Sequence, residues 1–190
     1  MKPLLIVLFL SLIFSKASLT QAGLHFSTGM SKAYNQDLRI TADGSHHPGY
    51  FIGADAILNE GKMYFVLGGQ YQQLDLNTQS PESYLRHGQA MRWWKLRAGL
   101  GFELFRLGKS AHVDLNTLGS INILSNYNEL ELDSNWGRFN NGTAALAFKL
   151  SLSLQYFSVF TEYEQGLVNS INQVKKTQFR ILSLGVGLAI

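Results

Sequence analysis

The chain has 190 residues, about the length of one domain, and its lack of cysteine excludes disulfides, zinc–thiolate sites and a thiol nucleophile. Hydrophobic residues reach 46% and charged residues only 15%, yet mean hydropathy is +0.00, so apolar residues are dispersed among small polar ones. Frequent glycine (18) and rare proline (3) favour many strands over helices or disorder.

The first 22 residues have the pattern of a secretory signal peptide. Lys2 gives a positive start, residues 3–14 are almost wholly apolar, and small-residue endings follow at Ala17 and Ala22. About 12 apolar residues are too few for a helix to cross a bilayer of about 30 Å. We therefore expect Sec-type export, cleavage after Ala17 or Ala22, and a mature domain over residues 23–190. Cleavage after Ala22 lowers the formal net charge from +3 to +1, so the basic pI is weak evidence for a nucleic-acid or anionic partner.

Eight segments of the mature domain alternate apolar and polar residues with period two, which is the signal of strands. The clearest segment sets Trp94, Leu96 and Leu100 against Lys95 and Arg97. The eight segments are residues 23–30, 50–58, 63–72, 93–104, 111–116, 146–153, 156–163 and 182–190.

Long and short connections alternate between these segments. The long ones span residues 31–49, 74–90, 124–141 and 165–176, and the short ones span 59–62, 105–110 and 153–155. If both termini are periplasmic, every long loop faces outward and every short turn faces the periplasm, as in bacterial outer-membrane barrels. The pattern predicts an all-β fold, an eight-stranded antiparallel up-and-down transmembrane β-barrel.

The alternation of apolar and polar residues does not by itself identify which face of the sheet contacts water, because a soluble lipocalin-like barrel has its apolar face inside. Glycine and serine on the polar face fit a crowded lumen and favour the membrane barrel. Aromatic residues near the strand ends also fit the interfacial girdles of a membrane barrel. Those aromatic residues are Tyr50, Tyr71, Trp93, Trp94 and Tyr163 at the loop end, and Tyr64, Phe105 and Tyr156 at the turn end.

Several stretches resemble the PorT-like outer-membrane β-barrel proteins of Bacteroidota-type bacteria. They are residues 50–55 (YFIGAD), 69–74 (GQYQQL), 94–96 (WKL) with 99–104 (GLGFEL), and a closing hairpin at 163–169 (YEQGLVN) and 183–188 (SLGVGL). The chain differs from that family in ending on Ile190 rather than an aromatic residue, and in lacking a proline in the fourth strand. The resemblance implies an outer-membrane barrel and no particular reaction.

His112 and Asp114 are the strongest candidates for chemistry, because residues two apart on a strand project to the same face. They fit a base and its orienting carboxylate, but no serine lies in a nucleophile setting. We expect a polar pair in a packed lumen, on the strand-five side of the periplasmic turn, with His112 bonded to Asp114 or Glu103. A lipid-modifying hydrolase that uses His112 stays open as an alternative.

The other polar groups are expected to be structural. Inward-facing Lys95, Arg97 and Lys149 nearly balance Asp55, Glu103, Asp114 and Glu162, so these side chains should neutralise one another and fill the barrel. The Gly99/Gly101 and Gly185/Gly187 pairs lack a following helix and are expected to save space. His46 and His47 are too few ligands to specify a metal. We expect no catalytic, cofactor-binding or metal-binding residue.

Taken together, these features predict a structural or interaction protein of the bacterial outer membrane. Its partners would be outer-membrane lipid and an extracellular or envelope protein that contacts the long loops, since loops on rigid scaffolds carry recognition. Loops 74–90 and 124–141 are the main candidates, with Tyr127 and Trp136 as anchors. A soluble lipocalin-like carrier of an apolar ligand is the remaining alternative.

Overall fold

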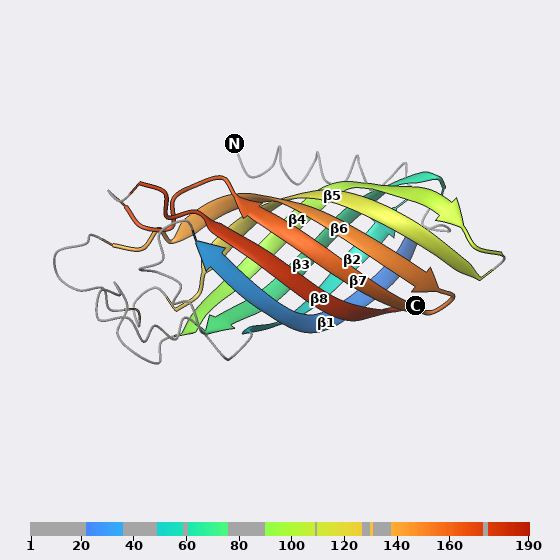
Figure 1. The fold of residues 1–190 in the computed structure, drawn as a ribbon, viewed down its shortest axis with the longest axis horizontal. Coiled ribbons are helices and arrows are strands. Elements are labelled where there is room, and N and C mark those ends of the chain that lie inside the picture. The colour runs from blue at the N-terminus through green and yellow to red at the C-terminus, as the bar shows by residue number, and fades with distance from the viewer. Residues whose placement is uncertain are drawn as a thin grey trace, which may run out of the picture.

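The computed structural model describes residues 22–35, 49–58, 61–75, 90–108, 110–126, 130, 138–172 and 175–190. Within these ranges eight antiparallel strands follow one another around a closed barrel, and the last pairs with the first (Figure 1). The strands are β1 (Ala22–Asn35), β2 (Gly49–Leu58), β3 (Met63–Asp75), β4 (Ala90–Arg106), β5 (Ala111–Leu124), β6 (Gly142–Leu154), β7 (Phe157–Gly166) and β8 (Phe179–Ala189). The predicted fold class is therefore confirmed.

No helix in the described part of the chain is both long and apolar enough to cross a membrane.

Several strands extend further toward the long loops than the alternation predicted. Strand β5 was expected over residues 111–116, yet its pairing with β4 and β6 continues to Leu124 and Ile123. The alternation weakens there because Leu118 lies on the otherwise polar inner face, whereas Thr117 and Gly119 lie on the outer face. Backbone pairing to both neighbours, and not side-chain polarity, sets the length of this strand.

The apolar face of the sheet points outward. On β8, Leu182, Leu184 and Val186 are exposed, whereas the alternating residues Ser183 and Gly185 are buried in the lumen. The other strands repeat this arrangement, and the charged residues Lys95 and Arg97 are buried inside. A lipocalin has the opposite polarity, so this arrangement argues against the alternative of a lipocalin-like carrier with an apolar interior.

Outward-facing aromatic rings form a row near the loop end of β2, β3 and β4. The ring centroids of Tyr50 and Tyr71 are 6.3 Å apart, and those of Tyr71 and Trp94 are 5.1 Å apart. This row fits the predicted girdle. The assignments of Trp93 and Tyr64 to the girdle were wrong, because both side chains are buried in the lumen, where the strand alternation directs them.

A β-bulge changes the side-chain directions at the turn end of β4. Glu103 pairs with Asp114, whereas Phe105 pairs with Val113, so Leu104 is the extra residue. Without the bulge Phe105 would face the lumen; with it, Phe105 is exposed on the outer face. Arg106 turns to the lumen mouth, opposite His112, and its guanidinium bonds Glu103 at 2.5 Å.

If the outward apolar face contacts lipid, the cost of placing a charge on it should depend on the position along the barrel. Leu184→Arg, at the middle of β8, should destabilise the folded barrel in lipid by about 2–4 kcal/mol or block insertion. Leu167→Arg, just past the loop end of β7, should cost only about 0–1 kcal/mol because a charge near the interface stays hydrated.

Both leucines are well exposed, at 65% and 59%, so they differ mainly in position along the barrel. The measurement is urea unfolding of each variant refolded into lipid vesicles. Equal tolerance of the two substitutions would contradict the assignment of this face to lipid.

Candidate functional site

The lumen is closed at the loop end by a cluster of buried apolar side chains, here called the loop-end plug. Trp93 of β4 and Phe179 of β8 meet edge to face with ring centroids 5.4 Å apart. Phe139 lies in the β5–β6 connection and Ile171 lies in the β7–β8 connection. The two residues pair as an isolated β-bridge, and their side chains join the plug. The full plug comprises Leu74, Met91, Trp93, Leu124, Phe139, Ile171, Phe179 and Ile181.

Beside the plug lie two buried ion pairs, here called the charge layer. Lys95 Nζ lies 2.5 Å from Glu164 Oε2, and Asn122 donates to the other Glu164 oxygen at 3.2 Å. Arg97 bonds Glu162 at 2.8 Å and also donates to Gln70. Two bases and two acids cancel in formal charge, so the predicted self-neutralising network is confirmed here.

Glu164 was absent from the predicted set of inward charges. The seventh segment was expected to end at residue 163, one position short of Glu164, whereas β7 continues to Gly166. Glu164 is the partner that compensates Lys95, which is among the most completely buried side chains of the barrel.

Lys149 lies on the turn side of the charge layer in a different setting. Its ammonium is 3.6 Å from Asp55 Oδ2 and 4.2 Å from the centroid of the Phe160 ring. The predicted inward direction of Lys149 and Asp55 is confirmed. A cation–π contact supplements the long ion pair, and together they hold a buried charge where β2, β6 and β7 face one another.

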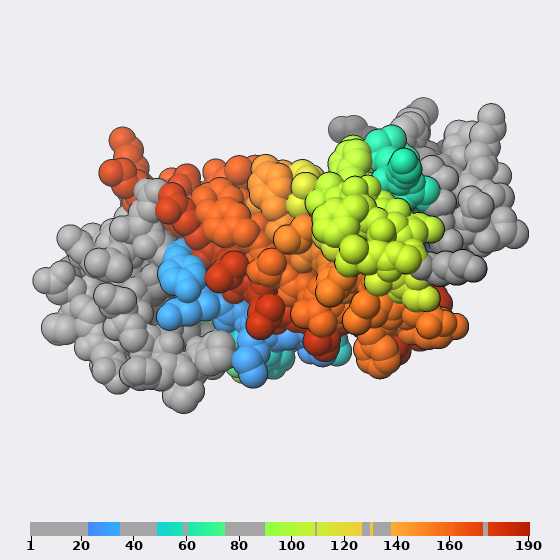
Figure 2. All heavy atoms as spheres, turned by 45° about the vertical axis from the view of Figure 1, so that its right-hand side comes forward, coloured from blue at the N-terminus to red at the C-terminus, as the bar shows by residue number. Residues whose placement is uncertain are grey.

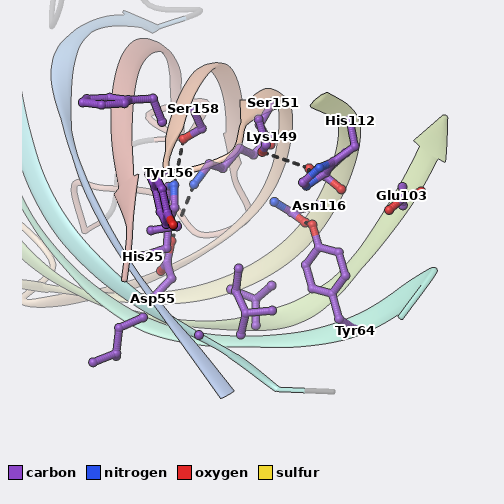
Figure 3. A pocket seen from close by; sticks show the side chains of 18 of the residues that line it. His25, Asp55, Tyr64, Glu103, His112, Asn116, Lys149, Ser151, Tyr156 and Ser158 are labelled. Carbon is purple, nitrogen blue, oxygen red and sulfur yellow. Dashed lines mark hydrogen bonds and ion pairs between the residues drawn. The ribbon is translucent and has the colours of Figure 1, made fainter. Parts of the chain in front are cut away.

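The turn-end half of the lumen contains a cavity of about 520 Å³, here called the turn-end chamber. His25, Asp55 and Ser158 lie on one side of it, and Tyr64, Asn116 and His112 lie on the other (Figure 3). Gly61, Gln155 and Tyr156 of the short turns line its mouth. The prediction that side chains fill the whole lumen is therefore wrong for this half of the barrel.

Two glycines let large side chains lie flat against the chamber wall. A Cβ on Gly101 would lie 2.1 Å from the Tyr64 ring, and a Cβ on Gly187 would lie 2.2 Å from the His25 ring. Both positions therefore need glycine for the rings to stay where they are. The prediction that the glycine pairs save space inside the barrel is confirmed at these two residues.

His112 and Asp114 meet as predicted, but their order does not suit nucleophilic catalysis. His112 Nε2 lies 3.2 Å from Asp114 Oδ2, and Ser153 donates to the same carboxylate oxygen at 3.2 Å. A catalytic triad needs the imidazole between the hydroxyl and the carboxylate, whereas here the carboxylate lies between. The geometry supports a contact that links β5 to β6.

A second histidine–serine contact was missed by the sequence analysis. His25 Nε2 lies 2.7 Å from Ser158 Oγ, although the residues are 133 positions apart. The alternation of apolar and polar residues placed both on the polar face. They come together only because β1 pairs with β8 and β8 pairs with β7 in the closed barrel.

The contact between His25 and Ser158 lacks the third member of a triad. Among the described residues, no carboxylate is hydrogen-bonded to the other ring nitrogen of His25, and Asp55 pairs instead with Lys149. Both side chains are buried, so the contact fits a structural hydrogen bond between strands.

Metal-ligand clusters are also absent from the described ranges, where no group of three His, Asp or Glu side chains is placed to hold an ion. His46 and His47, considered above as ligands, lie outside those ranges, as do Tyr127 and Trp136.

Comparisons with known proteins support the fold. No protein-family model and no curated protein matches the sequence, so the resemblance to PorT-like proteins stays a prediction. Neisserial surface protein A matches 88% of this chain and 96% of its own at 15% identity, with a TM-score of 0.55. The N-terminal β-barrel domain of Pseudomonas aeruginosa OprF matches 88% and 97% at 9% identity, with a TM-score of 0.50. The chain therefore has the fold of small outer-membrane β-barrels.

The Lys95–Glu164 pair provides a prediction about stability. Lys95→Met should lower the free energy of unfolding by about 3–5 kcal/mol, because it leaves a buried carboxylate with Asn122 as its remaining partner. Lys95→Met combined with Glu164→Gln should recover most of that loss, since no uncompensated charge remains.

The measurement is urea unfolding in lipid vesicles, read by tryptophan fluorescence. Arg106→Met breaks the more exposed Glu103–Arg106 pair and should have a much smaller effect. Additive losses in the double variant would show that the charge layer is not a coupled unit.

The plug and the charge layer together predict that the barrel does not conduct ions. Purified protein in a planar bilayer should show no reproducible open level, because side chains fill the loop-end half of the lumen. A steady, ion-selective current from the unmodified protein would require a path through the plug and would contradict this packing.

Proposed function

We propose that this protein is exported to the bacterial outer membrane, where the barrel is an anchor and the long loops contact an extracellular or envelope protein. The observation that supports this most strongly is the inverted polarity of the barrel, with apolar side chains outside and paired charges inside. A surface of this kind is stable in lipid and aggregates in water.

Strand lengths support the membrane setting. The strands have 10 to 17 residues, and about 9–11 tilted residues are enough to cross a bilayer. Every strand pairs with two neighbours, so the barrel exposes no unpaired edge to lipid.

The signal-peptide assignment of residues 1–22 is part of the proposal. Strand β1 begins at Ala22 and pairs with β2 from there, so cleavage after Ala17 would leave the whole strand intact. Cleavage after Ala22 would remove only its first residue.

The base of the loop region is well organised in the part that is described. Asn140 N donates to Ser170 O and Asn172 N donates to Arg138 O, both at 2.8 Å, which ties the end of the β5–β6 connection to the β7–β8 connection. Leu167 and Val168 are exposed beside this junction. A rigid base with apolar residues at its rim suits a contact surface, because recognition loops bind best when a scaffold holds their ends.

We propose no catalytic role. The carboxylate-centred order of Ser153, Asp114 and His112 and the lack of an orienting carboxylate at His25 both argue against a serine hydrolase. Loss of His112 should affect stability and leave the lipid composition of the membrane unchanged.

The first test of the proposal measures where the protein is located in the cell, and the second measures whether its loops contact another protein. The protein should fractionate with the outer membrane and migrate differently before and after heating. In cells, photo-crosslinkers at positions 127 and 136 should form discrete adducts with another protein.

A crosslinker at Leu184, on the lipid-facing wall, serves as the control and should give none. Recovery of the protein in the soluble periplasm would contradict the membrane proposal. Absence of adducts at every loop position, with normal insertion, would contradict the contact role alone.

A further inference from the structure

The charged side chains on the outer face of the barrel are distributed unevenly. Among the outward-facing strand residues whose side chains are described, those with a formal charge are Lys32, Arg92 and Arg180. All three are basic. Lys32 lies near the end of β1, and Arg92 and Arg180 lie near the starts of β4 and β8, so all three are at the loop end.

Lys32 and Arg180 are neighbours on adjacent strands. Tyr34 pairs with Arg180 and Lys32 pairs with Leu182, so the two basic residues are diagonal on the outer face of the β1–β8 ladder. Diagonal residues of an antiparallel pair are about 7–8 Å apart, within reach of long side chains. Figure 2 shows this face of the barrel, where the blue atoms of β1 adjoin the red atoms of β8.

The Arg180 guanidinium is held in place by its neighbours on β7. Arg180 Nε donates to Gln165 Oε1 at 3.1 Å, and Tyr163 donates its hydroxyl to the same oxygen at 3.0 Å. This bond uses Nε, the inner nitrogen of the guanidinium. Lys32 Nζ lies 5.5 Å from the centroid of the Tyr34 ring, on the same face.

In the described part of the chain, neither Lys32 nor Arg180 has a carboxylate partner. The buried bases Lys95, Arg97 and Lys149, by contrast, each form an ion pair with an acidic residue. Among the described residues, the outward pair, here called the basic rim (Lys32, Arg180), therefore carries two positive charges without a carboxylate partner above the apolar wall. A guanidinium held by Gln165 and a lysine diagonal to it on the next strand can both reach the oxygens of a phosphate group, and tyrosines suit the interfacial depth.

We propose that the basic rim binds the phosphate of a phosphorylated glycolipid in the outer leaflet, whose acyl chains lie along the apolar wall of β8 and β1. This inference rests on the membrane location proposed above. The wall below the rim is continuous and apolar, with Met30, Leu182 and Leu184 exposed, so it suits acyl chains better than a hydrophilic protein. The ligand therefore combines an anionic head with several apolar chains.

Native mass spectrometry of the full chain in detergent micelles tests the inference with two probes, bisphosphorylated lipid A and the same lipid after enzymatic dephosphorylation. The unmodified protein should prefer the phosphorylated form. The double variant Lys32→Gln/Arg180→Gln should lose about 30-fold in affinity for it, since each basic residue beside an anionic lipid contributes roughly fivefold.

Arg92→Gln removes the same charge from the opposite side of the barrel and should change affinity by less than the double variant. Arg180→Lys retains the charge without the two-nitrogen fork and should weaken binding less than Arg180→Gln. Heat-modifiable migration of every variant confirms that the barrel is folded.

Three outcomes would overturn the inference. They are equal binding of the two lipid forms, equal loss with Arg92→Gln, or full competition by inorganic phosphate, which would indicate an ion site without a lipid. Binding is measured on purified protein, whereas location is measured by cell fractionation. If the purified protein fails to prefer the phosphorylated lipid but the protein fractionates with the outer membrane, only the lipid-binding role of the basic rim is contradicted. Recovery outside the membrane contradicts the proposed function instead.

Discussion

Closure of the backbone hydrogen-bond ladder is the constraint on which the rest of this structure depends. In hydrocarbon an unpaired N–H or C=O costs several kcal/mol, so a sheet that crosses a bilayer must have no edge. The pairing of β8 with β1 from Phe179–Asn35 to Ala189–His25 removes both edges at once. Closure also fixes the direction of every strand side chain, because successive residues alternate between the outer face and the lumen around the whole circumference.

The lumen follows from closure. An eight-stranded barrel leaves an interior that side chains can just fill, and buried charges directed there must be paired with one another to offset the cost of desolvation. The loop-end plug and the charge layer satisfy this requirement with aromatic packing and two ion pairs. In the turn-end half, glycines at 101 and 187 let the Tyr64 and His25 rings lie against the wall, and a chamber remains between the two sides. Among the described residues the outward basic rim has no carboxylate partner, which is the reason for proposing an external anion there.

Much of this arrangement was predictable from the chain because alternation is a local property. Period two and the order of long and short connections gave the strand number, the barrel and the inward direction of Lys95, Arg97 and Lys149. Two features could not be predicted because they depend on how the strands pair. The His25–Ser158 bond needs the β1–β8–β7 order, and the direction of Arg106 needs a bulge at Leu104 that no residue type announces. Trp93 and Tyr64 were misplaced because aromatic character suggested an interface, whereas strand parity directed both rings inward.

Adjacent tryptophans on β4 test the central claim directly, since Trp94 is 58% exposed on the outer face and Trp93 is 3% exposed in the plug. Replacing Trp136 and one of this pair with phenylalanine leaves a single fluorophore in each of two variants. With both refolded into vesicles of brominated lipid, Trp94 emission should be strongly quenched, whereas Trp93 emission should be nearly unaffected. Equal quenching of the two, or stronger quenching of Trp93, would contradict a barrel with its apolar face toward lipid and its plug inside.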